Sequence, residues 1–542
     1  MSLIAQSPLF WFPDGTSLSN LGPMWALIGT MVALLLAPLA VGRGARTASL
    51  IALIGAVLTA AACFWVLPRV GEGGWAGMAP FDRAPMLVVD NFSLFFTLLL
   101  SLFLSAIIGL WIFGYYSPAP HSDMHRNAPE FFVLLLASAL GMVIMVSTSH
   151  VLMILIAVEL ASLPSYALAG FDKRRRLGAE ASLKYVLFGG ITSAIMIYGA
   201  SLLYGIYGTM DLAVIARGMA SPDGVSVLST IATFALMVGI GFKISAVPFH
   251  FWCPDVFEGA AIEVTTWLSV VSKAAGLGLL VRVVSMLAQV GIEPGYGYAL
   301  ATGIGLFATL TCTVGNLSAF RQTNIKRLLA YSSIAHAGYM LMAAAILVQA
   351  APDAAHPAFS ALAAYLVVYL FMNLGAFGCA AMVYWATGSE SIEGYGNLGR
   401  RHTFLAIAMT ICLVSLVGLP PLGGFAAKYW LLVNVWDAGM IWLVIVAVLN
   451  TALSLYYYVR VIRQMWLVED DSPAISAPAG GLAIVGLCSF VILWTGTLAI
   501  GTLRITAEDA TKYLYLGGAE PPAARTAAVS DAPPSGSPGG FR

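Results

Sequence analysis

Ionisable residues stand inside stretches that otherwise have the composition of lipid-buried helices. The chain is 60% hydrophobic and only 10% charged, and an ammonium group at membrane depth costs at least about 2.5 kcal/mol. Such stretches nevertheless contain five basic residues and one carboxylate, which are Lys184, Lys243, Lys273, Arg282, Lys428 and Glu159. Groups of this kind usually mark a path for ions or protons. The chemistry we expect is therefore proton transfer within the membrane.

Lys243 and Lys428 lie beside two interruptions that are rich in glycine and proline. The first interruption contains Gly239, Gly241 and Pro248, and the second contains Pro420, Pro421 and Gly423. A helix broken at membrane depth frees backbone groups, which is tolerated where they line a wet cavity. A desolvated lysine beside such a cavity can exchange a proton near neutral pH. The alternative is that each lysine extends to the membrane interface.

Glu159 lies in the middle of the apolar run 151–170. A lone buried carboxylate would neutralise itself, whereas one beside a lysine stays charged. Because separating the two groups changes the proton affinity of both, the pair can act as a switch. The alternative is a fixed ion pair that only joins two helices.

Three further residues are candidates for passing protons. Lys273 lies about eleven residues into its apolar stretch, which favours a relay between the two interruptions. Lys184 is close to the end of its stretch, so extension to the interface competes with a role in transfer. His336 could pass protons because imidazole titrates near neutral pH, or could serve only in packing. Arg282, near the other end of its stretch, is expected to be an anchor.

The elements that position these residues are membrane-spanning helices. A mean hydropathy of +0.88 over 542 residues excludes an ordinary soluble protein. A span needs about 20 mostly apolar residues. Fourteen stretches meet this requirement, near 22–41, 48–68, 91–114, 130–148, 149–170, 179–206, 225–248, 262–287, 296–317, 325–349, 358–385, 402–433, 438–462 and 482–503.

The positions of the basic residues support this count. With the N-terminus outside, the inner loops carry fourteen Lys and Arg residues, at 43, 46, 126, 173, 174, 175, 176, 321, 326, 327, 400, 401, 460 and 463. The outer side carries seven, at 69, 83, 217, 504, 512, 525 and 542. The excess follows the positive-inside rule. We therefore expect both termini on the outer side.

The two interruptions fall in the seventh and twelfth spans, which are five spans apart. Because five is odd, a second five-helix unit would enter the membrane from the opposite face, as in an inverted repeat. We expect an all-α polytopic membrane protein with two inverted five-helix repeats and discontinuous helices 7 and 12. The expected divisions are three N-terminal helices in 1–129, repeats in 130–287 and 288–465, a last helix in 466–504, and a polar, disordered tail in 505–542.

The sequence argues against cofactor chemistry within this chain. The six cysteines form no CxxC pair, so iron–sulfur and zinc ligation are not expected. No glycine-rich phosphate loop joins a strand-like run to a helix. The formal net charge of zero gives no basic footprint for nucleic acid. Any redox centres should therefore be on other chains.

Four segments resemble motifs of a known family. They are ELASLPSY at 159–166, ASLKY at 181–185, FKISAVPFHFW at 242–252 and NIKRLLAYSSIAH at 324–336. The chain resembles the antiporter-like membrane subunits of respiratory complex I over about residues 90–465. At the position of Lys273, two related subunits of complex I, named L and M, and the multisubunit sodium/proton antiporters have a histidine. One departure is the run AAIE at 260–263, where the family usually has a proline.

The resemblance implies fourteen helices, two inverted repeats and one proton pathway. It implies that Glu159 and Lys243 form the coupling pair, that Lys273 and His336 lie on a central hydrophilic axis, and that Lys428 closes the path. It places NADH, FMN, iron–sulfur clusters and quinone on partner subunits. The expected partners are other membrane subunits and a peripheral redox arm. The expected location is a bacterial inner membrane.

Three functions are compatible with these features. The leading hypothesis is a proton-translocating subunit of a redox-driven NADH:quinone oxidoreductase. The second is a subunit of a multisubunit cation/proton antiporter, which a histidine in place of Lys273 would have favoured. The third is a scaffold with inert lysines, against which the number of buried charges argues.

Overall fold

The structure of the chain is a computed structural model that describes residues 15–70, 76–78, 85–115, 127–173, 175–221, 224–289, 294–348, 357–470 and 472–511. Its first part contains α1 (Gly15–Asn20), α2 (Gly22–Val41), α3 (Ala45–Val70), strands β1 (Ala76–Met78) and β2 (Leu87–Val89), and α4 (Asn91–Tyr115). The strands form one antiparallel pair, with Gly77 opposite Val88.

The next helices cover the region predicted as the first repeat. They are α6 (Ala128–Val146), α7 (Val151–Ala169), α8 (Arg176–Tyr207), α9 (Leu212–Ala220), α10 (Val227–Ile244), α11 (Trp252–Gly259) and α12 (Ile262–Gln289).

The remaining helices complete the bundle. They are α13 (Pro294–Ala319), α14 (Ile325–Leu347), α15 (Pro357–Thr387), η1 (Ile392–Tyr395), α16 (Leu398–Arg401), α17 (Thr403–Val417), α18 (Gly423–Asp437), α19 (Ile441–Leu467), α20 (Ala479–Thr497) and α21 (Ile500–Thr511).

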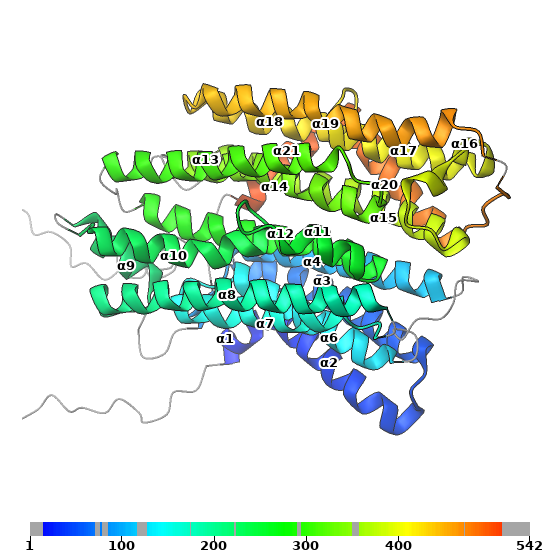
Figure 1. The fold of residues 1–542 in the computed structure, drawn as a ribbon. Coiled ribbons are helices and arrows are strands. Elements are labelled where there is room, and N and C mark those ends of the chain that lie inside the picture. The colour runs from blue at the N-terminus through cyan, green and yellow to red at the C-terminus, as the bar shows by residue number, and fades with distance from the viewer. Residues whose placement is uncertain are drawn as a thin grey trace, which may run out of the picture.

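The described residues contain thirteen helices that are long and apolar enough to cross a membrane. The remaining predicted span, 402–433, is divided into α17 and α18, which is why neither half meets the length on its own. The predicted all-α fold with about fourteen spans and discontinuous helices 7 and 12 is confirmed. Figure 1 shows the long helices running roughly parallel, with the helices after α12 stacked above those before it.

Contacts between loops support the alternation of the spans. At one end of the bundle, Ser149 Oγ donates a hydrogen bond to the carbonyl of Pro85 at 2.8 Å, and His150 pairs with Asp211. At the other end, Asn324 pairs with Ser391, and Arg175 forms an ion pair with Glu390. An error of one span would separate these loops by the thickness of the bundle.

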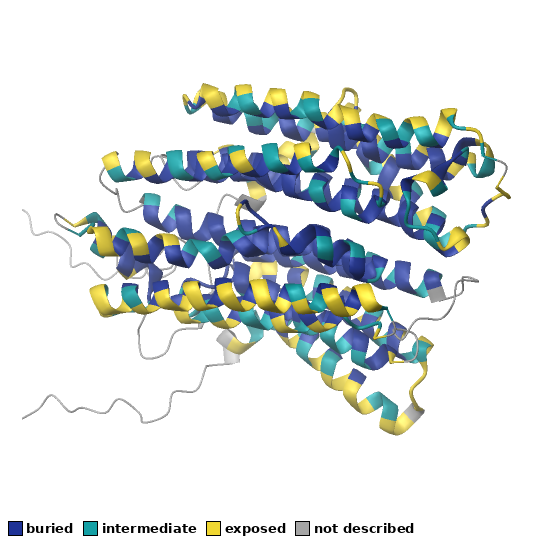
Figure 2. Cartoon of the chain, in the orientation of Figure 1, coloured by how far each residue is buried: buried dark blue, intermediate teal, exposed yellow. Residues whose placement is uncertain are grey.

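Three helices form the buried centre. In the most apolar 18-residue window of each helix, 94% of the residues of α12 and of α14 are buried, and 89% of those of α15. The corresponding share for α2 is 28%. Figure 2 shows the same contrast between dark central ribbons and yellow outer faces. Since outer apolar faces meet lipid, charged side chains at membrane depth are expected to face the centre.

Close helix crossings depend on glycine. A Cβ on Gly141 of α6 would lie 2.3 Å from the backbone nitrogen of Ala161 on α7, and one on Gly315 of α13 would lie 2.7 Å from that of Ala335 on α14. Small residues at such crossings let backbones approach, which drives helix association in lipid.

Both predicted interruptions are present, but the first lies further along than expected. Helix α10 continues through Gly239 and Gly241 to Ile244, and the break begins at Ser245, whose φ is 63°. Gly239 instead permits close packing, because a Cβ there would lie 2.2 Å from the Met196 sulfur of α8. Pro248 lies within the break. The segment after it, expected to be a loop, forms α11.

The second break separates α17 from α18. Gly418 has φ 89° and donates its N–H to the Val414 carbonyl, which ends α17. Pro420 and Pro421 lie in the break, and Gly423 is the first residue of α18.

The segment 505–542, expected to be disordered, begins as a helix. Helix α21 extends to Thr511 and packs against α15 and α4. Ala507 is buried, and Arg504 forms an i,i+4 ion pair with Glu508 at 2.7 Å. Packing of a short apolar face therefore stabilises a segment whose composition is polar. Residues 512–542 lie outside the described part of the chain.

Candidate functional site

Three lysines predicted to carry protons are buried inside the bundle. Lys243 on α10 is 1% exposed, Lys273 on α12 is 0% exposed and Lys428 on α18 is 5% exposed. None of the three forms an ion pair with a carboxylate among the described residues. A buried ammonium without a counter-ion is costly, so these lysines are not expected to serve only in packing.

Lys243 lies in the last turn before the first break. Its Nζ has no hydrogen-bond partner in the described part of the chain. The base of its side chain packs on α12, because a Cβ on Gly276 would lie 3.3 Å from Lys243 Cβ. Gly276 is about one helical turn from Lys273. Lys243 and Lys273 are therefore about one turn apart along the contact between α10 and α12.

Glu159 and Lys243 do not form a closed ion pair in this structure. Glu159 on α7 is half-buried, and its Oε1 accepts a hydrogen bond from Ser193 Oγ on α8. Glu159 is the carboxylate whose charge acts on Lys243. The role of Glu159 and Lys243 as a coupling pair therefore stays a prediction. Closing the pair would require Glu159 to exchange Ser193 for the ammonium.

Lys428 is held by the end of the second broken helix. Its Nζ donates to the carbonyl of Val417, the last residue of α17, at 2.9 Å, and to Thr451 Oγ1 at 3.4 Å. It also lies 4.4 Å from the ring centroid of Tyr339. The C-terminal carbonyls of a helix and the face of an aromatic ring both attract a cation. The break thus creates a cation site without a carboxylate.

Lys273 and His336 lie between the two breaks. Lys273 Nζ has no hydrogen-bond partner among the described residues and lies 5.4 Å from the Phe257 ring centroid. The Cys253 thiol of α11 is close to Lys273 and lies 4.0 Å from Ser333 Oγ on α14.

His336 follows Ser333 by three residues, on the same side of α14. Its Nδ1 lies 2.7 Å from the Tyr365 hydroxyl of α15. The rings of Tyr339 and Tyr369 enclose the imidazole, with centroids at 5.8 and 5.3 Å. The charge of Lys428 also acts on His336. We call the set of Lys243, Lys273, His336 and Lys428 the central file; Lys243 lies beside the first break and Lys428 beside the second.

Lys184 does not belong to the central file. Its side chain is 38% exposed, and it forms ion pairs with Asp255 at 2.7 Å and Glu180 at 2.8 Å. Arg327 contacts Asp255 at 2.6 Å and Glu258 at 2.7 Å. These five residues line a polar cavity of about 140 Å³ at the end of the bundle that we assign to the inner side. Asp255 and Glu258 are positioned by α11.

Ion pairs link helices at both ends of the bundle, one fully buried and two partly buried. Arg282, expected to be an interfacial anchor, is 0% exposed and forms a two-pronged pair with Asp90 at 3.0 and 3.1 Å. At the opposite end, Glu390 contacts Lys326 at 2.9 Å and Arg175 at 3.0 Å. Burial alone would raise the pKa of Glu390, but these two cations outweigh burial and lower it. Such pairs fix the geometry around the central file.

Glu263 is buried at the start of α12. The charges of Lys326 and Arg175, the two cations that also contact Glu390, act on it.

Several polar residues near the central file were not predicted. They are Cys253, Ser333, Tyr339, Tyr365 and Tyr369. Tyr365 and Tyr369 are one turn apart in the middle of an apolar span, although membrane tyrosines usually lie at the interfaces. That spacing was a usable signal. The partnership of Cys253 with Ser333 depends on tertiary packing and leaves no local pattern.

Comparisons with known proteins agree with this architecture. Residues 148–454, more than half of the chain, match a family model described as NADH:quinone oxidoreductase/Mrp antiporter, TM. The chain is 41% identical over 413 residues to NADH-quinone oxidoreductase subunit N of Anaeromyxobacter sp. (strain Fw109-5), which covers 72% of this chain and 78% of the relative. A subunit N 2 from Sorangium cellulosum (strain So ce56) is 41% identical over 405 residues, with the same coverage.

Solved structures show the same fold. A chain of respiratory complex I from Thermus thermophilus with bound aureothin has 32% identity and a TM-score of 0.72, and the match covers 89% of this chain and 98% of that chain. A chain of the Mrp complex from Dietzia sp. DQ12-45-1b has a TM-score of 0.76 at 20% identity, with 92% and 97% coverage. The predicted resemblance, including the preference for the subunit N type, is confirmed, and the chain belongs to the NADH:quinone oxidoreductase/Mrp antiporter family of transmembrane proteins.

Proposed function

We propose that this chain is the N-type, proton-translocating membrane subunit of a redox-driven NADH:quinone oxidoreductase. The observation that carries the proposal is the central file. It groups three buried lysines and a histidine, with one lysine beside each break and no carboxylate paired to any of these lysines among the described residues. Groups that are costly to charge and have no fixed counter-ion are suited to passing protons and unsuited to a scaffold.

Within this proposal each residue has a defined role. Glu159 sets the proton affinity of Lys243 by approaching or leaving it. Lys273 and His336 pass the proton along the centre, and Lys428 releases it at the second break. Lys184 organises the polar cavity at the inner end through Asp255. The breaks at Ser245 and Gly418 supply water and free backbone groups at both ends.

The assembly and location follow from the same reading. We place NADH, FMN, iron–sulfur clusters and quinone on partner subunits, since the sequence has no nucleotide loop or cluster motif and its relatives are named as single subunits of such enzymes. We also propose a bacterial inner membrane, with both termini outside. The predicted repeats, 130–287 and 288–465, correspond to α6–α12 and α13–α19.

A cation/proton antiporter subunit is the second candidate, because a chain of an Mrp complex shares the fold. Lys273 and the subunit N relatives favour the redox enzyme. Affinity purification of the tagged chain from detergent-solubilised native membranes tests the choice. NADH:quinone reductase activity should co-purify with the chain, while the isolated chain should show none. Recovery of an assembly that exchanges sodium for protons and lacks this reductase activity would support the antiporter.

A further inference from the structure

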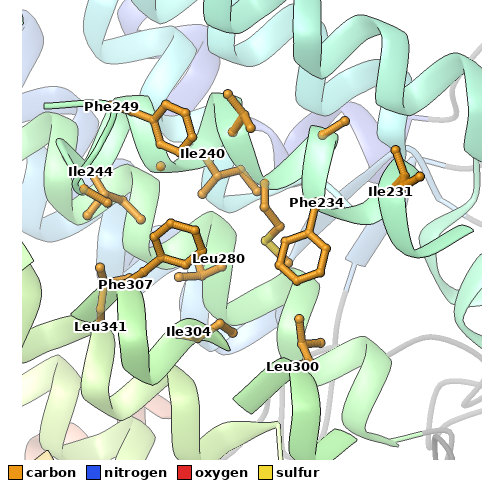
Figure 3. A pocket seen from close by; sticks show the side chains of 15 residues that line it. Ile231, Phe234, Ile240, Ile244, Phe249, Leu280, Leu300, Ile304, Phe307 and Leu341 are labelled. Carbon is orange, nitrogen blue, oxygen red and sulfur yellow. The ribbon is translucent and has the colours of Figure 1, made fainter. Parts of the chain in front are cut away.

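An apolar pocket reaches the first break from the lipid-facing side of the bundle. It has a volume of about 350 Å³ and opens on one side. Figure 3 shows Ile231, Phe234 and Ile240 of α10 on one wall, Leu300, Ile304 and Phe307 of α13 on the other, and Ile244 and Phe249 at the break. Its lining offers no side-chain hydrogen-bond donor or acceptor, so an occupant must be apolar.

The mouth of the pocket lies on a surface that faces lipid. Ile231 is 51% exposed and Phe234 is 40% exposed, whereas Ile244 and Leu341 at the closed end are 1% and 4% exposed. Helix α10 packs on α8 and α12, while α13 packs on α14 and α19. The pocket therefore lies in a seam between two groups of helices, with α8, α10 and α12 on one side and α13, α14 and α19 on the other.

The dimensions of the pocket select its occupant. Ile231 at the mouth and Ile244 at the closed end are thirteen residues apart, so the pocket extends about 20 Å along α10. That is shorter than the hydrocarbon core of about 30 Å, so the pocket does not cross the membrane. A helix about 20 Å long and about 10 Å in diameter would occupy about 1,500 Å³, several times the volume of the pocket. A single unbranched hydrocarbon chain fits.

We propose that this pocket binds one acyl chain of a membrane phospholipid from the leaflet at the Val227 end of α10. The chain enters between Ile231 and Leu300 and ends against both sides of the break, at Gly241 and Ile244 before it and Ala246 and Phe249 after it. In the chain, Lys243 lies between Gly241 and Ile244. Hydrocarbon in the pocket therefore keeps water from reaching Lys243 along the lipid-facing seam, so protons must use the central file.

Photo-crosslinking tests the site in the assembled complex. The complex is reconstituted into phosphatidylethanolamine vesicles containing a phospholipid with a diazirine at the acyl terminus, then irradiated and digested. Adducts should appear on the pocket residues 240–249 and on Phe307 or Leu341. Ile304→Trp should lower these adducts about tenfold by filling the pocket. Leu306→Trp, on the lipid-exposed face of the same helix, should leave them unchanged.

Ile304→Phe provides a milder filling variant if Ile304→Trp reduces the amount of assembled complex, and it should lower the adducts in the same direction. The proposal is overturned if wild-type complex shows no adduct at the closed end of the pocket, as it would if a neighbouring subunit covered the seam. It is equally overturned if filling the pocket leaves labelling at the closed end unchanged.

Discussion

At the scale of single residues, two kinds of buried charge must be distinguished. Arg282 has a carboxylate and a backbone carbonyl as partners, whereas Lys243 and Lys273 have no hydrogen-bond partner in the described structure. Both kinds were visible in the sequence as basic residues in apolar stretches. The difference between them in partners was not visible in the sequence, because Asp90 is 192 residues away from Arg282 in the chain. Burial alone therefore does not separate the two kinds of charge, and our proposal that the lysines carry protons rests on their missing counter-ion.

The Arg282–Asp90 pair should be structural. Arg282→Met leaves Asp90 with its main cationic partner removed, and breaking a buried pair costs about 3–5 kcal/mol. We expect a large fall in the melting temperature of the purified complex and a smaller fall for Arg282→Met combined with Asp90→Leu. Arg504→Met, which breaks an exposed pair, should change stability by less than about 1 kcal/mol. Similar melting temperatures for the Arg282 and Arg504 variants would contradict this assignment.

Tyr365 should orient His336 for proton transfer. Tyr365→Phe removes the hydroxyl that lies 2.7 Å from Nδ1, and loss of one hydrogen bond of about 1 kcal/mol corresponds to about fivefold slower proton translocation. Proton uptake and NADH oxidation are measured together in inverted membrane vesicles. Tyr395→Phe is the control, because the Tyr395 hydroxyl is buried and has no hydrogen-bond partner among the described residues. Equal translocation by the two variants would remove Tyr365 from the account.

At the scale of elements, the breaks decide where charge can be held. The number, order and approximate limits of the spans could be predicted, because apolar length is a local property. The exact position of the first break could not be predicted from the sequence. Gly239 and Gly241 indicated a break, but tertiary packing against Met196 and Phe249 accounts for these glycines, and the chain turns at Ser245 instead. Helices α11 and α21 were missed because packing, not propensity, stabilises them.

The second break should depend on Gly418 for two separable reasons. Its φ of 89° strains any other residue by about 1–2 kcal/mol, and a Cβ there would lie 3.3 Å from Lys428 Nζ. Gly439→Ala is a matched control, since Gly439 has φ 79° and open space around its Cβ. Both variants should lower the melting temperature of the complex, but only Gly418→Ala should also slow proton translocation. Equal translocation in both variants would show that the contact with Lys428 is irrelevant.

At the scale of the whole molecule, alternation of the spans places the charged loops at two opposite ends. The loop contacts support this alternation, because residues 85, 149 and 211 meet at one end and 175, 324 and 390 at the other. Which end faces inward rests on the distribution of basic residues. The orientation therefore stays a prediction from the sequence, whereas the ion pairs among Glu390, Lys326 and Arg175 could not be predicted from it.

A labelling experiment tests the orientation. Lys173 is exposed in the inner-side loop, whereas Arg175 is partly buried in its pair with Glu390. Lys173→Cys should resist a membrane-impermeant maleimide in intact cells and react in inverted vesicles. The six native cysteines are buried, which keeps their background low. Ready labelling of Lys173→Cys in intact cells would invert the proposed topology.

The central claim is that Lys243 releases and regains a proton during turnover. Moving one charge against 100 mV costs about 2.3 kcal/mol, and a change of two pK units in a carrier is worth about 2.7 kcal/mol. One open-and-closed cycle of Glu159 with Lys243 is thus of the required size. Lys243→Arg keeps the positive charge but cannot release its proton, because guanidinium is effectively always protonated.

The most direct measurement is the ratio of protons translocated to electrons transferred by the assembled Lys243→Arg complex in sealed vesicles, with Lys173→Arg as the surface control. The account predicts that Lys243→Arg assembles and loses coupled translocation, while Lys173→Arg keeps the wild-type ratio. A Lys243→Arg complex that pumps at the wild-type ratio would show that Lys243 only balances the charge of Glu159, and would contradict the mechanism.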